Sequence, residues 1–375
     1  MMMARSLSAL TLLAALGGAL LPGATGGACT SQQCRPRATA DGPLLVLYAR
    51  GGFGQPGPVA GDGQILALRG SLVIQSLVRG LPWPFAGGFA PSPQGRYVAY
   101  GEDVTPGLGA ASHTEGLWVI GSAGGPPRRL LSPPRSASGQ AVYRIGPVAW
   151  SSDQSTLAYA VNDAEDYSVN PRSLGVWLTR YDQPRPRLLA PLAALGVMTA
   201  GGAPISQLSW SPDGRTLAVS AERAGGDATQ PGQRTPVVLA LDAVTGQSRM
   251  LVDGGWYASY APTGASLTYV TGGIGTVATP MALWVADARG QHRRKLVSVS
   301  GTILSPVWSP DGRAIAYIEG GRAADRPTAI HLLDAITGQD WVILTSTGAG
   351  QRLFAPGGRF LRLAWMRAWP NGGRP

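Results

Sequence analysis

The stretch WSPDGRTLAV, from Trp210 to Val219, returns almost unchanged as WSPDGRAIAY from Trp308 to Tyr317. Its Ser-Pro-Asp-Gly core presets a tight turn, because Pro fixes φ, Asp hydrogen-bonds to its own backbone and Gly accepts a positive φ. The residues after the turn form a short, almost wholly apolar strand, which is typical of a strand buried between layers. Each copy therefore predicts a strand, a turn and a second strand.

Weaker copies of this stretch begin near Pro91, Trp150 and Tyr260. Every copy is followed by two more apolar runs, and the last run starts with a basic residue and a leucine in units such as Arg129-Leu130-Leu131. Four strands per unit at a regular spacing is typical of propeller blades. The complete units run over 87–132, 146–191, 206–252, 257–299 and 305–345.

The N-terminal strands within 44–80 lack a preceding turn of the repeated type. The C-terminus can supply the missing strand from either of two segments, Leu363–Trp365 followed by the turn at 369–374, or 354–359. In both cases a sixth blade is completed from the two ends of the chain, which removes an open sheet edge. The sequence thus predicts an all-β fold, a six-bladed β-propeller with four-stranded antiparallel blades, over residues 44–375.

These units resemble the PD-type propeller repeat, a relative of WD repeats. That repeat occurs in the TolB family and in the propeller domains of prolyl oligopeptidase-like enzymes. The resemblance covers residues 44–375 and rests on 210–215 and 308–313, with support from the third strands at 283–287 and 330–334. The motif implies the fold rather than one activity. TolB itself carries an additional N-terminal α/β domain, so the resemblance is to the propeller alone.

The composition fits this fold. The chain of 375 residues is 44% hydrophobic and 14% charged, and its 53 Gly and 31 Pro fall between apolar runs, where they predict turns. The net charge is +10, and Lys295 is the only lysine. The arginines are scattered, with short groups only at Arg128-Arg129 and 293–295, each at the start of a strand. Nucleic-acid binding would need basic residues clustered with aromatic ones, so we expect no nucleic-acid partner.

Residues 1–28 read as a signal peptide. Arg5 supplies the basic start, and the apolar stretch Leu7–Leu21 is too short and too rich in glycine to remain as a membrane span. Residues 29–43 form a polar linker to the propeller. We therefore expect an exported, extracytoplasmic protein that is periplasmic, on the outer surface or secreted.

Cys29 and Cys34 leave alternatives open. Gly26-Gly27-Ala28-Cys29 resembles the lipobox of bacterial lipoproteins, which implies a lipid anchor on Cys29 and membrane association, although Gly26 stands where Leu is usual. The alternative is cleavage after Ala28 and a Cys29–Cys34 disulfide, as in other exported proteins. Free thiols are the third interpretation.

The sequence predicts no catalytic, cofactor or metal site. It has no Gly-x-Ser-x-Gly elbow. His113, His292 and His331 are dispersed, and two cysteines add too few ligands for a metal. His331 lies on an apolar strand and is expected to hydrogen-bond through one nitrogen. The acidic run 162–166 is expected to be a solvated loop, with calcium binding as the alternative.

The tryptophans and the turn aspartates have structural interpretations. Asp213 and Asp311 are assigned to turn chemistry. The tryptophans that recur at strand positions are expected to pack between blades. These are Trp118, Trp150, Trp177, Trp210, Trp284 and Trp308. Trp83, Trp256 and Trp369 fall outside the pattern and are expected at an exposed surface.

The function favoured by the sequence is a non-catalytic scaffold that binds a protein partner in the cell envelope, through loops on one face or through the central funnel, as a monomer or as a subunit of a larger assembly. The longest insertions, 101–115, 161–175 and 221–235, all follow the second strand of a blade and should share the partner-binding face. The alternative is a funnel-site enzyme, a metal-assisted lyase or hydrolase acting on a small molecule or glycan. Propeller lyases that resemble this repeat use several histidines around a metal.

Overall fold

The computed structural model describes residues 42–49, 63–81, 88–102, 116–132, 143–163, 174–197, 205–224, 234–273, 280–320, 328–346 and 359–366. They lie within one compact unit that spans Pro36–Pro375. In these residues the backbone forms 24 β-strands and one short helix, α1 (Leu192–Leu195). The described residues contain no helix with the length and apolar character of a membrane span.

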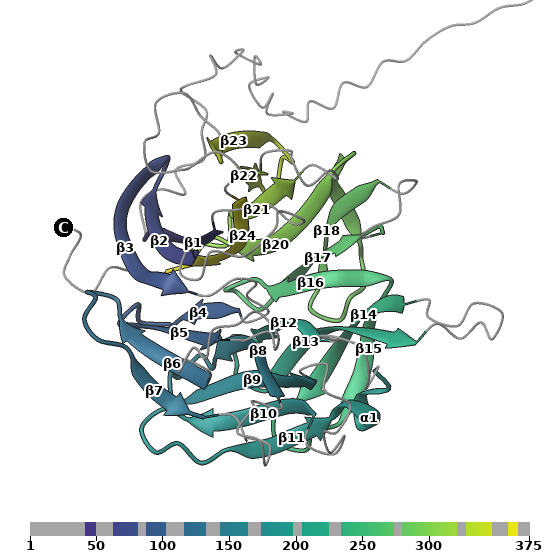
Figure 1. The fold of residues 1–375 in the computed structure, drawn as a ribbon. Helices are drawn as coiled ribbons and strands as arrows, with labels where there is room; N and C mark the ends of the chain where they lie inside the picture. The colour runs from purple at the N-terminus through teal and green to yellow at the C-terminus, as the bar shows by residue number, and fades with distance from the viewer. Residues whose placement is uncertain are drawn as a thin grey trace, which may run out of the picture. The chain divides into compact units, whose positions relative to one another are not determined.

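The strands form six four-stranded antiparallel sheets, which are the blades of a β-propeller (Figure 1). Blade 1 contains β4 (Phe89–Pro91), β5 (Tyr97–Glu102), β6 (Gly116–Gly121) and β7 (Arg128–Leu131), and blade 2 contains β8 (Tyr143–Trp150), β9 (Thr156–Asp163), β10 (Gly175–Arg180) and β11 (Arg187–Pro191). Blade 3 contains β12 (Ile205–Trp210), β13 (Thr216–Ala224), β14 (Arg234–Asp242) and β15 (Ser248–Asp253), and blade 4 contains β16 (Gly255–Tyr260), β17 (Ser266–Thr271), β18 (Met281–Asp287) and β19 (Arg294–Val299). Blade 5 contains β20 (Thr302–Trp308), β21 (Ala314–Gly320), β22 (Thr328–Asp334) and β23 (Asp340–Thr345), and blade 6 contains β24 (Arg359–Trp365), β1 (Leu44–Ala49), β2 (Gly63–Arg69) and β3 (Leu72–Leu81).

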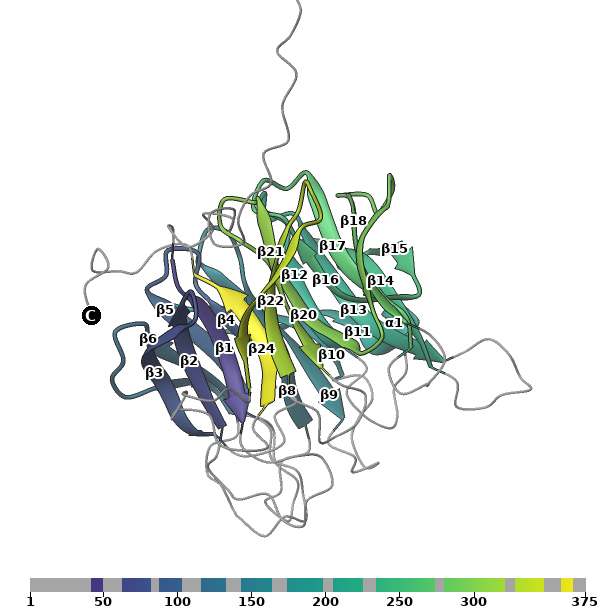
Figure 2. The same cartoon turned by 90° about the horizontal axis from the view of Figure 1, so that it is seen from above.

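The first strands of the blades close into a ring. β4 contacts β8, and the contacts continue through β12, β16, β20 and β24 back to β4. Figure 2 shows the strands of neighbouring blades side by side when the same unit is viewed from above. The ring surrounds the axis of the propeller, so any axial cavity is lined by six strands.

Blade 6 is completed from both ends of the chain, as the sequence predicts. β24 pairs antiparallel with β1, and Trp365 lies opposite Leu44. Of the two candidate closing segments, Leu363–Trp365 lies within the strand. Residues 354–358 lie outside the described part of the chain. The ring of Phe360 is fully buried against Tyr48, 6.0 Å between centroids, which ties the closing strand to its neighbour.

The Ser-Pro-Asp-Gly segments form the predicted turns. Ser211 donates to Asp213 at 2.5 Å, and the same carboxylate accepts the backbone N–H of Arg215 at 3.0 Å. Gly214 has a φ of 70°, the left-handed conformation that glycine tolerates. The hydrogen bond from Ser211, followed by that from Arg215, lowers the pKa of Asp213. Asp311 makes the same contacts, so the turn assignment of both aspartates is confirmed.

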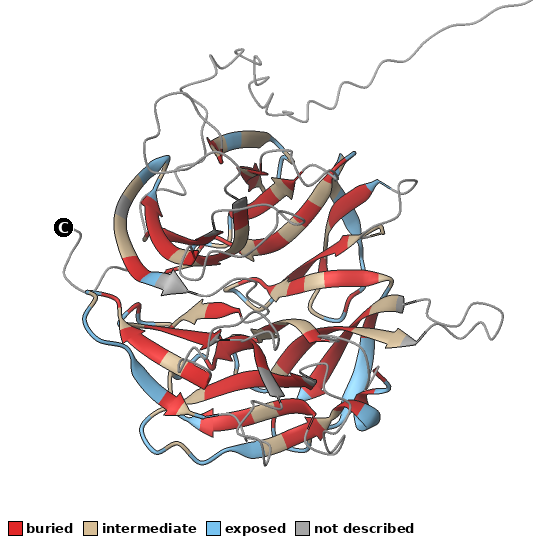
Figure 3. Ribbon diagram, in the orientation of Figure 1, coloured by how far each residue is buried: buried red, intermediate tan, exposed pale blue. Residues whose placement is uncertain are grey.

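Arginines at the start of outer strands join neighbouring blades. Arg128 donates to the carbonyl of Tyr181 at 3.3 Å and lies over its ring. Arg187 donates to the carbonyl of Ala243 at 3.4 Å, one blade further on. Figure 3 shows exposed residues gathered at outer strands and turns, while buried residues run through every blade. These arginines therefore lie at the outer edges of the blades, where they join blade 1 to blade 2 and blade 2 to blade 3.

Candidate functional site

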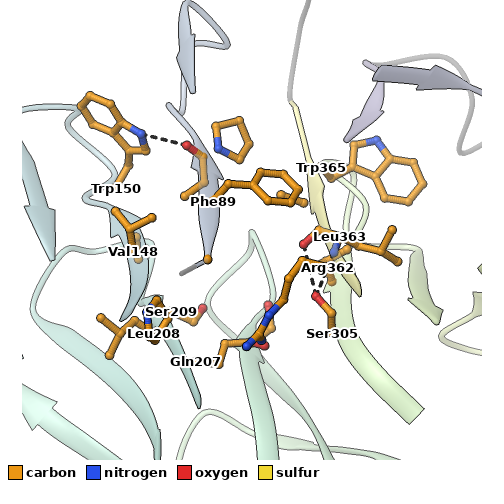
Figure 4. Close-up of a pocket in the computed structure, with 18 of the residues that line it drawn as sticks. Phe89, Val148, Trp150, Gln207, Leu208, Ser209, Ser305, Arg362, Leu363 and Trp365 are labelled. Atoms are coloured by element: carbon orange, nitrogen blue, oxygen red, sulfur yellow. Dashed lines mark hydrogen bonds between the residues drawn. The ribbon is translucent and has the colours of Figure 1, made fainter. Parts of the chain in front are cut away.

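A cavity of about 260 Å³ lies on the axis of the propeller (Figure 4). All six first strands contribute to its lining, from Gly88–Pro91, Pro147–Trp150, Gln207–Trp210, Ser259–Pro262, Ser305–Trp308 and Arg362–Trp365. Because equivalent positions of the blades face the same axis, the lining can be read as successive layers of six residues.

The layer beside the Ser-Pro-Asp-Gly turns is rich in tryptophan. Its members are Pro91, Trp150, Trp210, Tyr260, Trp308 and Trp365. Three of the tryptophans donate an indole N–H to the innermost strand of the preceding blade, to Ala90, Ala149 and Ser259 at 3.0, 3.2 and 3.2 Å respectively. The prediction that Trp150, Trp210 and Trp308 pack between blades is confirmed. What the sequence did not indicate is that these residues also line a cavity.

A second layer lies three residues earlier in each first strand. Its members are Gly88, Pro147, Gln207, Tyr257, Ser305 and Arg362, of which all but Tyr257 line the cavity. In four of the strands the pairing register shifts at or beside this position. Tyr257 and Ser305 have φ values of 52° and 50°. A β-bulge of this kind re-aims a side chain, and here the bulges set what faces the axis.

Of the described residues that line the cavity, Arg362 carries the one charged side chain. Figure 4 shows it extending from β24 into the cavity. Its guanidinium carbon lies 5.6 Å from the ring centroid of Tyr257, across the ring in blade 4. Burial raises the pKa of Tyr257, and the nearby guanidinium partly opposes this. Beside Tyr257, the side chain of Gln207 donates to the carbonyl of Ala258 at 3.2 Å.

Two of the lining hydroxyls, those of Ser209 and Ser305, bond to the backbone. Ser209 accepts the N–H of Tyr260 at 3.0 Å, and Ser305 accepts the N–H of Leu363 at 2.9 Å. Among the described residues that line the cavity there is no His, Cys, Asp or Glu. Over all the residues that the structure describes, no group of three or more such side chains is placed to hold a metal ion. The lining thus offers a cation, aromatic rings and amide groups, which suit binding.

Several predicted residues lie outside the described residues. These are Cys29, Cys34, Trp83, His113 and Trp369, together with residues 1–41 and most of the three long insertions. His292 is described and exposed, and its Nδ1 lies 2.8 Å from Asp287, whose pKa this hydrogen bond lowers. It lies in the turn between β18 and β19, away from the cavity lining.

His331 differs from its prediction, because both of its ring nitrogens have partners. Nε2 lies 3.2 Å from Glu319 and Nδ1 lies 3.0 Å from Asp340. Tyr317 stacks on the imidazole, 4.8 Å between centroids, and donates its hydroxyl to Asp340 at 2.6 Å. Burial, and then this hydrogen bond, raise the pKa of Tyr317. The sequence could not reveal the two carboxylates, since they come from neighbouring strands.

Two further predictions are wrong. Trp256, expected at an exposed surface, is 7% exposed and donates its indole N–H to the carbonyl of Gly272 at 3.1 Å. Asn162, expected in a solvated loop, belongs to β9 and is fully buried. In both cases the strand extends further than the apolar pattern indicated. Residues 164–166 of the acidic run lie outside the described residues.

Comparison with known proteins supports the propeller fold. No protein-family model matches the chain. The chain is similar to TolB. Residues matching the Tol-Pal system protein TolB of Methylobacillus flagellatus are 29% identical over 164 positions, 38% of this chain and 36% of that protein. TolB of Albidiferax ferrireducens matches at 34% identity over 83 residues, 22% of this chain and 18% of that protein. The matches therefore span about a third or less of these curated relatives.

Solved structures show the same fold. Crystalline TolB from Acinetobacter baumannii superposes with a TM-score of 0.59 at 13% identity, covering 86% of this chain and 66% of that one. A chain of a nidogen/laminin complex superposes with a TM-score of 0.55 at 12% identity, covering 88% of this chain and 100% of that one. At these identities the likeness shows the fold alone. The TolB-like propeller that the repeats indicate is thus supported both by sequence and by structure.

Proposed function

We propose that this chain is a non-catalytic β-propeller of the cell envelope that holds a protein partner at its axial cavity. The proposal rests on the size and lining of this cavity. Its volume of about 260 Å³ is below the range of roughly 300–1,000 Å³ typical of pockets for drug-sized ligands. A space of this size suits a side chain or a short segment of a larger partner.

The lining chemistry supports binding over catalysis. General acid–base catalysis needs a titratable side chain within hydrogen-bond reach of the substrate. Among the described lining residues, the one titratable group besides a guanidinium is the Tyr260 hydroxyl, and burial raises its pKa. Aromatic rings and arginine, which the lining combines, are enriched at the centres of protein interfaces. The hydroxyls of Ser209 and Ser305 already bond to backbone, which leaves them poorly placed as nucleophiles.

The similarity to TolB, a protein named for the Tol-Pal system, supports a place outside the cytoplasm. The signal peptide predicted at residues 1–28 agrees with it. The insertions 101–115, 161–175 and 221–235 follow β5, β9 and β13, and in an antiparallel meander these connections leave from one face. We assign them to the outer part of the partner surface.

Capture of partners from an envelope extract of the native host tests the proposal. The immobilised wild-type protein is compared with Gln207→Trp, which fills the cavity, and with Val342→Trp on the exposed edge of β23. A partner that binds at the axis is lost with Gln207→Trp and retained with Val342→Trp. Ser259→Trp is a second filling variant, and thermal unfolding checks that each variant folds. Equal capture by filled and unfilled proteins would overturn the proposal.

Intact mass of the mature protein from membrane and soluble fractions tests its location. An acylated Cys29 in the membrane fraction establishes a lipid anchor. A soluble chain that starts at Cys29 and is two mass units light establishes the Cys29–Cys34 disulfide. A chain that retains residues 1–28 in the cytoplasm contradicts export.

A further inference from the structure

The Arg362 guanidinium lies across the axial ring instead of against its own blade. Its strand, β24, belongs to blade 6, whereas the Tyr257 ring under the guanidinium belongs to blade 4. The intervening blade contributes only Ser305 to this layer. Blade 3 contributes Gln207, whose side-chain amide donates to the carbonyl of Ala258. Gly88 and Pro147 complete the layer from blades 1 and 2, and neither carries a polar side-chain group. Arg362 is therefore the one charged group of the layer.

No hydrogen bond or ion pair joins Arg362 to the rest of the described residues. A guanidinium has five N–H donors, and the contact with Tyr257 satisfies none of them. Glu222 acts electrostatically on Tyr257, is half-buried and has an interaction of its own, and no ion pair joins it to Arg362 among the described residues. A half-buried charge without hydrogen-bond partners is costly. A ligand that accepts from the guanidinium removes that cost.

A carboxylate fits this arrangement better than other anions. Its two coplanar oxygens match the fork of a guanidinium, and its single negative charge balances the single cation. A phosphate monoester carries a charge of about −1.5 to −2, so it would leave unbalanced negative charge in the cavity. The tryptophan layer next to Arg362 can pack against the apolar part of the same ligand.

We infer that the axial cavity recognises a carboxylate group through Arg362, either from the side chain or chain end of a protein or from a small acid. The inference rests on the proposed function in one respect, since both concern the same axial cavity. It adds the chemistry that the partner must present there.

Calorimetric titration of the full mature protein with defined probes tests the inference. The probes are acetyl-Ala-Leu-Ala-Leu with a free carboxylate, the same peptide as its amide, acetyl-Ala-Glu-Ala-Leu amide, and acetyl-leucine. Probes with a carboxylate should bind about tenfold or more tightly than the neutral amide, the scale of one charge-assisted hydrogen bond. The ranking of the three acids identifies a chain end, a side chain or a small acid as the source.

Arg362→Gln should abolish the preference for carboxylates, and Arg313→Gln, on an exposed turn, should preserve it. The inference is overturned if the amide binds as well as the acids, if Arg362→Gln binds as wild type, or if no probe binds at millimolar concentration. Retention of an envelope partner by Arg362→Gln, combined with its loss in Gln207→Trp, would refute carboxylate recognition while leaving the proposed function intact.

Discussion

The indole N–H of Trp150 donates a hydrogen bond of 3.0 Å to the carbonyl of Ala90 in the preceding blade. The equivalent tryptophan of the closing blade, Trp365, has a buried indole N–H with no partner in the described part of the chain. Trp150→Phe should therefore destabilise the protein by about 1–3 kcal/mol through a lost hydrogen bond and lost volume. Trp365→Phe should cost about 1 kcal/mol less, because no bond is lost. Urea unfolding measures both, and equal losses would contradict this account.

Close approach between blades at Gly246 leads to a second prediction. Gly246 has a φ of 73°, and a Cβ there would lie 2.2 Å from the carbonyl oxygen of Leu189 in the neighbouring blade. Gly254 has a φ of 76° with open space around it. Gly254→Ala should cost about 1–2 kcal/mol for the backbone conformation alone. Gly246→Ala should cost about 2 kcal/mol more, because the blades must separate. Thermal unfolding that ranks the two variants equally would exclude a tight blade contact.

The turn carboxylate of Asp213 predicts a loss of stability in acid. Its folded pKa is lowered from the ordinary value of 3.8, first by Ser211 and then by Arg215. A carboxylate whose pKa is lower in the folded than in the unfolded state stabilises the fold at any pH above its unfolded pKa. This stabilisation is lost as the pH falls through the folded pKa. Asp213→Asn should therefore narrow the gap between urea midpoints at pH 7 and pH 2.5. Asp253→Asn, at an exposed ion pair, serves as the control. If Asp213→Asn shows the same difference in urea midpoint between pH 7 and pH 2.5 as the wild type, this prediction is wrong.

His331 stands where blade 4 has a tryptophan, which gives a coupled prediction. Tyr317 lies opposite His331 in blade 5, as Tyr269 lies opposite Trp284 in blade 4. The Trp284 indole donates to Thr271, and at the equivalent positions His331 contacts Glu319. His331→Trp alone should destabilise by about 1–3 kcal/mol, because Glu319 loses its imidazole partner and Asp340 keeps only the hydroxyl of Tyr317.

Adding Glu319→Thr rebuilds the blade 4 pair and should recover part of that loss. A double-mutant cycle by chemical denaturation measures the coupling between the two positions. Strict additivity of the two changes would show that the side chains act independently.

The sequence predicts the fold because the turn chemistry is local. Ser211 and Asp213 form their turn with residues at most five positions away, so the repeat can be read directly. The sequence leaves the identity of the closing strand open, because the pairing of Trp365 with Leu44 joins residues from the two ends of the propeller. The partners of His331 and the burial of Trp256 likewise depend on neighbouring strands.

The sequence indicates the central funnel as one place for a partner or substrate, but the residues that line it were not predicted, although a signal for them exists. Arg362 lies three residues before Trp365, as Gln207 lies three residues before Trp210. Alignment of the first strands on their tryptophans would have brought these residues into one layer. That they face a cavity still depends on the bulges and on the closed ring, neither of which a repeat motif specifies.

The most direct measurement is photo-crosslinking in the native host from a benzoylphenylalanine placed at position 207, with the same probe at exposed position 342 as the reference. The account predicts a discrete protein adduct from the axial position that is absent from the reference and weakened by Arg362→Gln. The same adducts from both positions, or none from the axial one, would contradict a protein partner held at the axis of the propeller.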